Sequence, residues 1–323
     1  MGNNFFLTPE EYQNDSLKKF ALVVLENYQI SVKSIEMINY ENNATFKITT
    51  TDETNYAFRI SVNSPRSKAN IEAEVAYVKF LNNSDLIKTA RPISNKHGSY
   101  ITTFFHQEIG RDLNSVMYSW LDGVDVGDDP TPTQLRALGA AMAHMHNLSV
   151  DFALPDNSQP PTFNDPFWGS PDLLRGEESR LSDEHKKLVI DAFDEVTRRT
   201  NDLFEKNKAH VIHADLHGWN LKWDLGQLSV FDFDDCGIGL PIQDIATAVY
   251  YLDTPDQDQA LLEGYKSVKP LPKYEEKDLK MLLLHRRLLL LNYLYETMKA
   301  EHASILPDYL EETIRRVKVF LEI

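Results

Sequence analysis

Two spacings of hydrophobic residues divide the chain into a strand-rich first third and a helix-rich remainder. In residues 34–60, short runs of Ile, Thr, Phe and Tyr are separated by the polar stretches ENN and TDETN, which is typical of three antiparallel strands with turns. Residues 70–83 (NIEAEVAYVKFLNN) return to helical spacing, and strand-like runs follow near residues 90–105 and 115–121. The pattern predicts a small mixed sheet with one inserted helix.

A helix start precedes this sheet in the stretch LTPEEY. Thr8 has the character of an N-cap, Pro9 suits the first helical position, and Glu11 would complete a capping box. We therefore expect a helix from here to about Tyr28.

After residue 123 the spacing becomes mainly helical. Residues 131–149 carry an apolar stripe at three- and four-residue intervals, which indicates the core face of a helix. Residues 155–171 hold five prolines and predict a loop or a broken helix, and helices resume to about residue 208. The apolar stripe consists of Leu135, Leu138, Met142 and Met145.

The most apolar stretch of the chain is residues 281–295, MLLLHRRLLLLNYLY. His285, Arg286 and Arg287 interrupt it, so it predicts a buried helix rather than a membrane span. We interpret its arginine pair, like the pair at 315–316, as part of a solvated helix face and not as a binding patch.

Length and composition limit the classes of protein that need to be considered. A chain of 323 residues with 42% hydrophobic and 25% charged residues suggests about two globular domains. The net charge of −16 would repel nucleic acid and anionic membranes, so we expect neither as a partner. The single cysteine, Cys236, excludes an intramolecular disulfide and a Cys-rich zinc site, and the beginning of the chain lacks a secretion signal. We expect a cytoplasmic protein.

Two short stretches, HADLHGWN at 213–220 and FDFDD at 231–235, concentrate carboxylates between apolar runs. The order strand, loop, strand, turn, strand places Asp215 and Asn220 in one loop and Asp232 at a neighbouring strand end. Phosphoryl transfer needs such a set, with one carboxylate for the attacking hydroxyl and a carboxamide and second carboxylate for magnesium.

The two stretches together resemble the aminoglycoside phosphotransferase and choline kinase family, a branch of the protein-kinase-like fold. The resemblance implies an α+β, two-lobed structure with a small antiparallel-sheet lobe and a mainly helical lobe. Residues 1–118 would form the nucleotide-binding lobe, 119–123 the hinge, and 124–323 the helical lobe with the catalytic loop and substrate site.

The same resemblance implies roles for individual residues. Asp215 would be the catalytic base, Asn220 and Asp232 the magnesium ligands, and Asp244 an acid that supports the site. His213 and His217 would also be supporting residues, whereas the roles of Asp234 and Asp235 stay open.

In the first third, NYAFRI resembles the kinase strand that carries the phosphate-contacting cation, with Arg59 in the usual place of Lys. Glu74 would be its acidic partner, and Glu72 is the alternative. The hairpin MINYENNATFKI contains no glycine, which favours a small-molecule kinase over a protein kinase. The resemblance further implies that Asn43 and Thr45 approach the phosphates, and that Trp120 and Leu121 in the hinge contact adenine.

The function that follows is transfer of the γ-phosphoryl group of ATP, or alternatively GTP, to a hydroxyl of a small molecule with Mg²⁺. Aminoglycosides, choline, homoserine and similar amino alcohols are candidate acceptors, and the acidic second half of the chain favours an acceptor with an amine.

Sequence features suggest two alternative functions. A nucleotide-binding pseudokinase without turnover is suggested only by Arg59. ADLHG also resembles the first metal motif of calcineurin-like phosphoesterases, but only His285 and His302 follow His217, both in helical segments, so the further ligands are missing.

Overall fold

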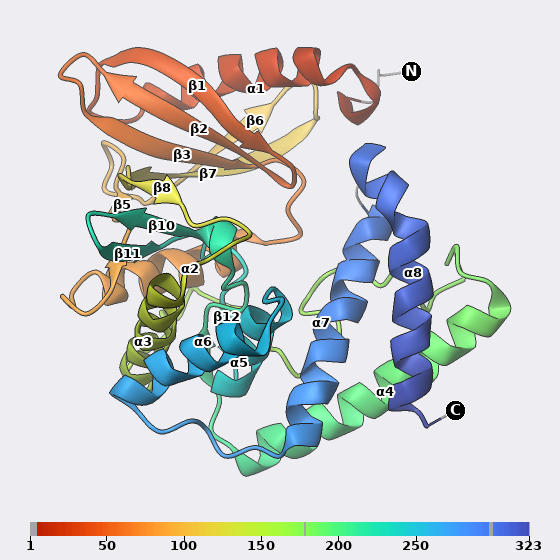
Figure 1. Cartoon of the computed structure of the whole chain (residues 1–323). Coiled ribbons are helices and arrows are strands. Elements are labelled where there is room, and N and C mark those ends of the chain that lie inside the picture. The colour runs from red at the N-terminus through yellow and green to blue at the C-terminus, as the bar shows by residue number, and fades with distance from the viewer. Residues whose placement is uncertain (1–4, 178, 297–299, 323) are drawn as a thin grey trace. The chain divides into compact units, whose positions relative to one another are not determined.

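The computed structural model describes residues 5–177, 179–296 and 300–322, and the chain divides into two compact units (Figure 1). The first unit is formed by Met1–Val124 together with the segments Ala153–Gln159 and Ser229–Asp234. The second comprises Asp125–Phe152, Pro160–Leu228 and Asp235–Ile323. Each unit is described by itself.

The first unit is built on a six-stranded sheet in the order β1-β2-β3-β7-β5, with β6 also paired to β7. The pairings are antiparallel, as the spacing of residues 34–60 predicted. The helical elements of this unit are η1 (Phe5–Leu7), α1 (Glu10–Leu25) and α2 (Lys68–Leu81). Its sheet strands are β1 (Val32–Tyr40), β2 (Asn43–Thr50), β3 (Asn55–Ser61), β5 (Pro92–Ile93), β6 (Ile101–His106) and β7 (Arg111–Ser119).

Helix α1 is shorter than predicted, and its cap differs. Pro9 occupies the N-cap position without a side-chain cap, because the Thr8 hydroxyl donates to the carbonyl oxygen of Phe5 at 2.7 Å. Thr8 therefore closes the preceding 3-10 turn, and the predicted capping box is wrong. The helix ends at Leu25, three residues before the expected end.

Strict alternation along β2 separates the two faces of the sheet. Ala44, Phe46 and Ile48 are fully buried and pack with the apolar face of α1, which Figure 1 shows alongside the sheet. Thr45 points to the opposite face and pairs in register with Arg59 on β3. The candidate nucleotide residues thus share the face away from this core.

A short parallel ladder extends the first unit. Strand β4 (Lys88–Thr89) pairs with the end of β11 (Gln227–Val230) through Ser229 and Val230. Beyond β11 the chain leaves the extended conformation, and Asp232 has a left-handed φ of 60°. The strand predicted to end at Asp232 therefore ends two residues earlier.

The second unit is mainly helical, as predicted. Helices α3 and α6 pack so closely that a Cβ at Gly139 would lie 2.0 Å from the carbonyl oxygen of Leu261. The helices are α3 (Pro132–Ser149), α4 (Asp183–Lys206), α5 (Pro241–Tyr250), α6 (Pro255–Val268), α7 (Glu276–Glu296) and α8 (Ala300–Phe320). The remaining elements are β8 (Val124–Asp125), β9 (His210–Ile212), η2 (Gly218–Asn220), β10 (Leu221–Asp224) and β12 (Gly237–Gly239), which pairs antiparallel with β9.

Helices α4, α7 and α8 surround a second hydrophobic core (Figure 1). Helix α7 has buried residues on every side, so the prediction of a buried helix over residues 281–295 is confirmed. Its arginines are buried with it: Arg286 is 9% exposed and Arg287 is 7% exposed. The interpretation of this pair as part of a solvated face is wrong, because an all-apolar helix has no polar face to offer. Among the described residues, no helix is both long and apolar enough to cross a membrane.

Candidate active site

The Asp215 carboxylate lies in the loop between β9 and β10, and both of its oxygens have hydrogen-bond partners. Its Oδ1 accepts a hydrogen bond from Nη2 of Arg286, on α7. Its Oδ2 lies 3.1 Å from Nδ2 of Asn220 and 3.3 Å from Nε2 of His217. All these residues belong to the second unit. Their contacts fix the orientation of the Asp215 carboxylate within the loop.

The protonation state of Asp215 follows from these contacts. Burial raises the pKa of the carboxyl, but the Arg286 guanidinium and the His217 hydrogen bond lower it more, so that the pKa lies well below its usual range. Asp215 is therefore a carboxylate at neutral pH. Such a group is a weak base, and it is better suited to orienting a hydroxyl than to deprotonating it in advance.

Asn220 is oriented by its own loop. Its Nδ2 donates to the carbonyl oxygen of Asp215 at 2.8 Å as well as to the Asp215 carboxylate. Because the amide nitrogen is used in this way, the carbonyl oxygen Oδ1 is the side-chain atom that can bind a cation.

Asp244 supports the loop through the backbone. Its carboxylate accepts the amide N–H of Ala214 at 2.6 Å and that of His213 at 3.2 Å. Ala214 has a φ of 70°, a costly conformation for a residue with a Cβ, and these hydrogen bonds help to maintain it. Burial raises the pKa of the Asp244 carboxyl, but the hydrogen bond and charge of His146, together with His213 and the Ala214 amide, lower it more, so the net shift is downward.

His146 completes this support and was missed in the sequence. Its Nε2 lies 2.9 Å from Oδ2 of Asp244, and its Nδ1 lies 2.9 Å from the hydroxyl of Tyr265. The signal available in the sequence was a histidine directly after Met145 and four residues after Met142, on the predicted core face, and the structure shows that it is fully buried.

His217 joins the loop to an aromatic neighbour. Its Nδ1 accepts the amide N–H of Trp219 at 3.4 Å, so in the neutral ring Nε2 carries the proton and donates to Asp215. The imidazole packs against Tyr251 with 4.7 Å between ring centroids, and the Tyr251 hydroxyl accepts from Nη2 of Arg286 at 2.7 Å. Burial raises the pKa of Tyr251 to about 12, so this hydroxyl stays neutral.

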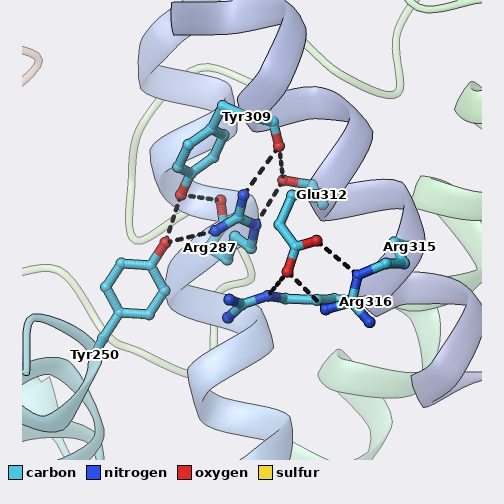
Figure 2. Close-up of polar contacts among 7 residues, drawn as sticks. Tyr250, Arg287, Tyr309, Glu312, Arg315 and Arg316 are labelled. Atoms are coloured by element: carbon cyan, nitrogen blue, oxygen red, sulfur yellow. Dashed lines mark hydrogen bonds and ion pairs between the residues drawn. The ribbon is translucent and has the colours of Figure 1, made fainter. Parts of the chain in front are cut away.

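Arg287, the neighbour of Arg286, makes a separate network (Figure 2). It donates to the Thr313 hydroxyl at 2.9 Å and to the Tyr309 carbonyl oxygen at 3.1 Å, and its guanidinium lies 4.0 Å from the centre of the Tyr309 ring. The Tyr309 and Tyr250 hydroxyls are 2.7 Å apart. Within the described residues Arg287 has no carboxylate partner, so dipoles and an aromatic ring alone balance its charge.

The candidate nucleotide residues lie in the first unit. Arg59 pairs with Glu74 at 2.5 Å, and the Tyr118 hydroxyl donates to the other Glu74 oxygen at 2.5 Å. The acid that Arg59 contacts is thus Glu74, and not Glu72. Nη1 of Arg59 lies 3.9 Å from Oδ1 of Asp232, whose side chain is 45% exposed. Burial lowers the pKa of Arg59, but Glu74 and other anions raise it further, so the guanidinium is charged.

Asn43, at the start of β2, contacts the segment after Asp232. Its Nδ2 donates to Oδ2 of Asp234 at 2.6 Å. The turn that lacks glycine is thereby tied to the FDFDD segment. Trp120 follows β7 and carries Lys47 over its ring at 4.7 Å, with the half-buried Leu121 next in the chain.

A cavity of about 360 Å³ opens beside the loop between β9 and β10, entirely within the second unit. Trp219 at its edge is 54% exposed, and its Nε1 donates to Oδ1 of Asp128 at 2.7 Å. No lysine or arginine lines it, and neither of its two carboxylates forms an ion pair in the described part of the chain. The polar and aromatic residues that line it include Asp128, His217, Trp219, Tyr250, Tyr251 and Asp253.

One side of the cavity depends on contact between two glycines. Gly127 donates its amide N–H to the carbonyl oxygen of Gly218 at 3.0 Å, and a Cβ at Gly218 would lie 1.8 Å from the Gly127 oxygen. The loop between β9 and β10 can contact the segment before α3 only because residue 218 is a glycine.

The donor types suit magnesium. Mg²⁺ favours oxygen ligands and takes one or two from the protein with the remainder from phosphates and water, and Asn220 Oδ1 and the Asp232 carboxylate are of this kind. No group of three His, Cys, Asp or Glu side chains that could hold a metal occurs among the described residues.

Comparisons with known proteins agree with this chemistry. Residues 39–276 match the model of the phosphotransferase enzyme family. Amicoumacin kinase of Bacillus subtilis (strain 168) is 26% identical over 218 residues, which is 65% of this chain and 62% of that protein. An uncharacterised protein of Synechocystis sp. is 26% identical over 235 residues, 70% of this chain and 63% of its own length. The chain thus spans somewhat over three fifths of these relatives.

Solved structures show the same fold at low identity. The amicoumacin kinase hAmiN, in complex with AMP-PNP, Ca²⁺ and Ami, superimposes with a TM-score of 0.77 at 20% identity, covering 95% of this chain and 96% of that one. A microcompartment-associated aminopropanol kinase gives 0.76 at 21% identity, covering 94% and 98%. The predicted α+β, protein-kinase-like fold is confirmed. With residues 39–276 matching the family model, the chain belongs to the phosphotransferase enzyme family.

Proposed function

We propose that this protein transfers the γ-phosphoryl group of ATP to a hydroxyl of a small molecule. The observation that carries the proposal is the loop from His213 to Asn220, where a partly buried carboxylate is fixed beside a carboxamide whose oxygen is left to bind a cation. The names of the relatives support a small-molecule acceptor, because they are kinases of amicoumacin and of aminopropanol.

Asp215 accepts a hydrogen bond from the acceptor hydroxyl and directs its oxygen toward the γ-phosphorus. The new P–O bond forms as the bond to the ADP oxygen breaks, and the hydroxyl proton passes to Asp215 or to a phosphate oxygen. Because the pKa of Asp215 is low, the proton leaves late, which suits the loose transition state of phosphoryl transfer. Magnesium held by Asn220 and Asp232 would supply positive charge to the phosphates.

The first unit contributes the nucleotide contacts in this proposal. Arg59, held by Glu74, offers a planar fork to phosphate oxygens in place of the point charge of a lysine. Asn43 and Thr45 lie on the same hairpin, and residues 119–123 act as the hinge between nucleotide-binding and helical lobes, where Trp120 and Leu121 receive the purine. ATP is the proposed donor, and GTP is the alternative that a competition assay would distinguish.

The acceptor carries an amine in this proposal. The net charge of −16 favours cations in general, and the cavity beside the loop adds Asp128 and Asp253, two carboxylates that form no ion pair with any described residue, among aromatic rings. A panel of hydroxyl compounds with and without amines, assayed by ADP release, tests this. Turnover with neutral sugars alone would overturn the amine assignment and leave the kinase intact. The need for ATP makes the cytoplasm the proposed compartment.

Two matched variants test the catalytic assignment. Asp215→Asn should keep Mg-ATP affinity and lose turnover by about 10³-fold or more, since the hydroxyl loses its acceptor. Asp232→Asn should weaken Mg-dependent ATP binding, since a neutral oxygen replaces an anionic ligand. Calorimetric titration with and without magnesium, beside single-turnover assays, separates the two.

Each result has a clear meaning. Near wild-type transfer by Asp215→Asn would refute the assignment of the loop. A wild-type protein that binds Mg-ATP but turns over no acceptor would be the pseudokinase that Arg59 suggests. Phosphate release without any nucleotide would indicate a phosphoesterase.

A further inference from the structure

Arg286 lies beside the one carboxylate on which the proposed reaction depends. It sits at the middle of α7, 71 residues from Asp215 along the chain, and is 9% exposed. Sequence motifs gave it no role. The cost of burying a guanidinium is large unless its partners repay it, so the contacts of Arg286 need an explanation.

The contacts divide the Asp215 carboxylate between two sets of donors. Arg286 holds Oδ1, while Asn220 and His217 hold Oδ2. The donors of Oδ2 come from the loop itself and could turn with it. Arg286 is the only one of the three that belongs to another element, so it fixes the direction of the carboxylate relative to the helical core.

Tyr251 connects the two sets. Its hydroxyl accepts from the same Nη2 of Arg286 at 2.7 Å, and its ring packs on the His217 imidazole, which holds Oδ2. A guanidinium can serve Asp215 and Tyr251 together because its donors have fixed directions in one plane. An ammonium group has no such fixed plane.

The Arg286 guanidinium also keeps unused capacity. Its Nε is buried and has no hydrogen-bond partner among the described residues. A buried donor without a partner costs free energy, which a structural role alone does not explain. Its charge beside Asp215 also disfavours an ammonium group there, so that an acceptor would present its neutral hydroxyl to Asp215 and its amine elsewhere.

We propose that Arg286 is a positioning residue that holds the Asp215 carboxylate in the direction the acceptor hydroxyl requires, with Tyr251 as its brace. The inference rests on the proposed function, since it concerns the reaction at Asp215. Arg286 acts through Asp215, and it is distinct from the residues that bind the nucleotide.

The test uses Arg286→Ala, Arg286→Lys and, as the matched control, Arg287→Ala, all as full-length chains. Arg287 is the adjacent buried arginine of the same helix and has no contact with Asp215. Single-turnover rates are divided by the folded fraction from circular dichroism, and ATP affinity is measured by calorimetry. We expect Arg286→Ala to lower kcat by about 10²-fold, the cost of a misplaced reacting group, with ATP affinity unchanged.

Chemical rescue separates positioning from folding. Added guanidinium or methylguanidinium, at millimolar concentrations that do not unfold the protein, should raise the rate of Arg286→Ala at least tenfold. It should leave the rate of Arg287→Ala unchanged. Arg286→Lys should recover little, because an ammonium cannot bridge Asp215 and Tyr251 in one plane. Tyr251→Phe keeps the charge, removes one bond, and should lower kcat several-fold.

The outcomes are distinguishable. Equal kcat in Arg286→Ala and wild type, or full activity in Arg286→Lys, overturns the inference and leaves the kinase assignment intact. Should Arg286→Ala fail to fold, Tyr251→Phe with unchanged kcat overturns it. Absence of turnover in the wild type on the whole acceptor panel refutes the proposed function itself.

Discussion

Two of the chain's Arg-Arg pairs lie on the packed helices α7 and α8, and their environments are opposite. Arg286 and Arg287 on α7 are buried, whereas the side chains of Arg315 and Arg316 on α8 are 64% and 46% exposed and both contact Glu312. Figure 2 shows both environments: Arg287 lies between two tyrosines, whereas the two arginines of α8 contact the Glu312 carboxylate. The same dipeptide thus serves a site and a surface.

The difference lies in what surrounds each pair in the sequence. On α8 the arginines stand in EETIRRVKVF, where charged residues recur on one face. On α7 they stand in LLLHRRLLLL, where no polar face exists. A charged pair in a helix that is apolar all round must be buried, and a buried charge needs a partner or a function. The composition around a charge therefore says more than the charge itself.

The largest effect on stability is expected for Arg287→Ala compared with Arg316→Ala. The first change leaves a cavity in the core and removes the donor from the Thr313 hydroxyl and the Tyr309 carbonyl, which should cost about 3–5 kcal/mol. The second should stay within about 0.5 kcal/mol. Urea unfolding of both variants measures the difference, and equal losses would remove the contrast between the two helices.

His285, next to the buried arginine pair, should make the stability of the protein depend on pH. Burial lowers the pKa of His285 from its usual 6.5 to about 4. Between these values the unfolded chain binds a proton here that the folded chain does not, so the free energy of unfolding falls as pH falls through this window. The resulting loss in the free energy of unfolding should reach about 3 kcal/mol below pH 4.

Urea unfolding of His285→Gln at several pH values checks this effect. Gln can still donate to the Pro166 carbonyl oxygen, which His285 contacts at 2.7 Å, but it does not titrate. The variant should lose stability less steeply between pH 6.5 and 4 than wild type. The exposed His97→Gln is the control and should keep the wild-type slope. Parallel curves for His285→Gln and wild type would contradict the prediction.

A smaller effect is expected when only one hydroxyl of the buried network is removed. Tyr309→Phe keeps the ring that packs on Arg287 but loses the bond to the Tyr250 hydroxyl, so it should cost about 1 kcal/mol. Tyr100→Phe, whose ring packs on Lys79, is the matched control and should be nearly neutral. An equal or larger loss in the control would contradict the prediction that the buried hydrogen-bond network makes the Tyr309 hydroxyl stabilising.

The smallest effect should follow from Glu312→Gln on α8. The carboxylate pairs with two arginines, but all three groups are solvated, and exposed ion pairs contribute little and are screened by salt. The thermal midpoint should change little at low salt and not at all at 1 M NaCl. A pronounced destabilisation at high salt would show that this pair, too, is structural.

Sequence reasoning recovered what is local in the chain. The hairpins of the first unit and the sharing of one loop by Asp215 and Asn220 follow from spacing and turns over a few residues. The order of helices in the second unit was also predictable. The prediction of Thr8 as an N-cap was wrong, because its hydroxyl hydrogen-bonds within the preceding turn and not to the helix.

Contacts between distant segments were not predictable from one sequence. Arg286 and Asp215 meet only because α7 is wholly buried and its rotation places this side chain at the loop. His146 reaches Asp244 through the packing of α3, and Trp219 was visible in the motif without its partner Asp128. The left-handed backbone of Ala214 has no sequence signal either, since a residue with a Cβ ordinarily avoids that conformation.

The contact between Gly127 and Gly218 has a consequence for changing the acceptor range by laboratory evolution. Any side chain at 218 would collide with the opposing backbone, so most clones that carry a substitution there would misfold in a library that randomises residues 213–220 evenly. The neighbouring Trp219 is half exposed and borders the cavity. Diversity placed at 219 together with 128, with both glycine codons held constant, would sample new acceptors while the loop keeps its shape.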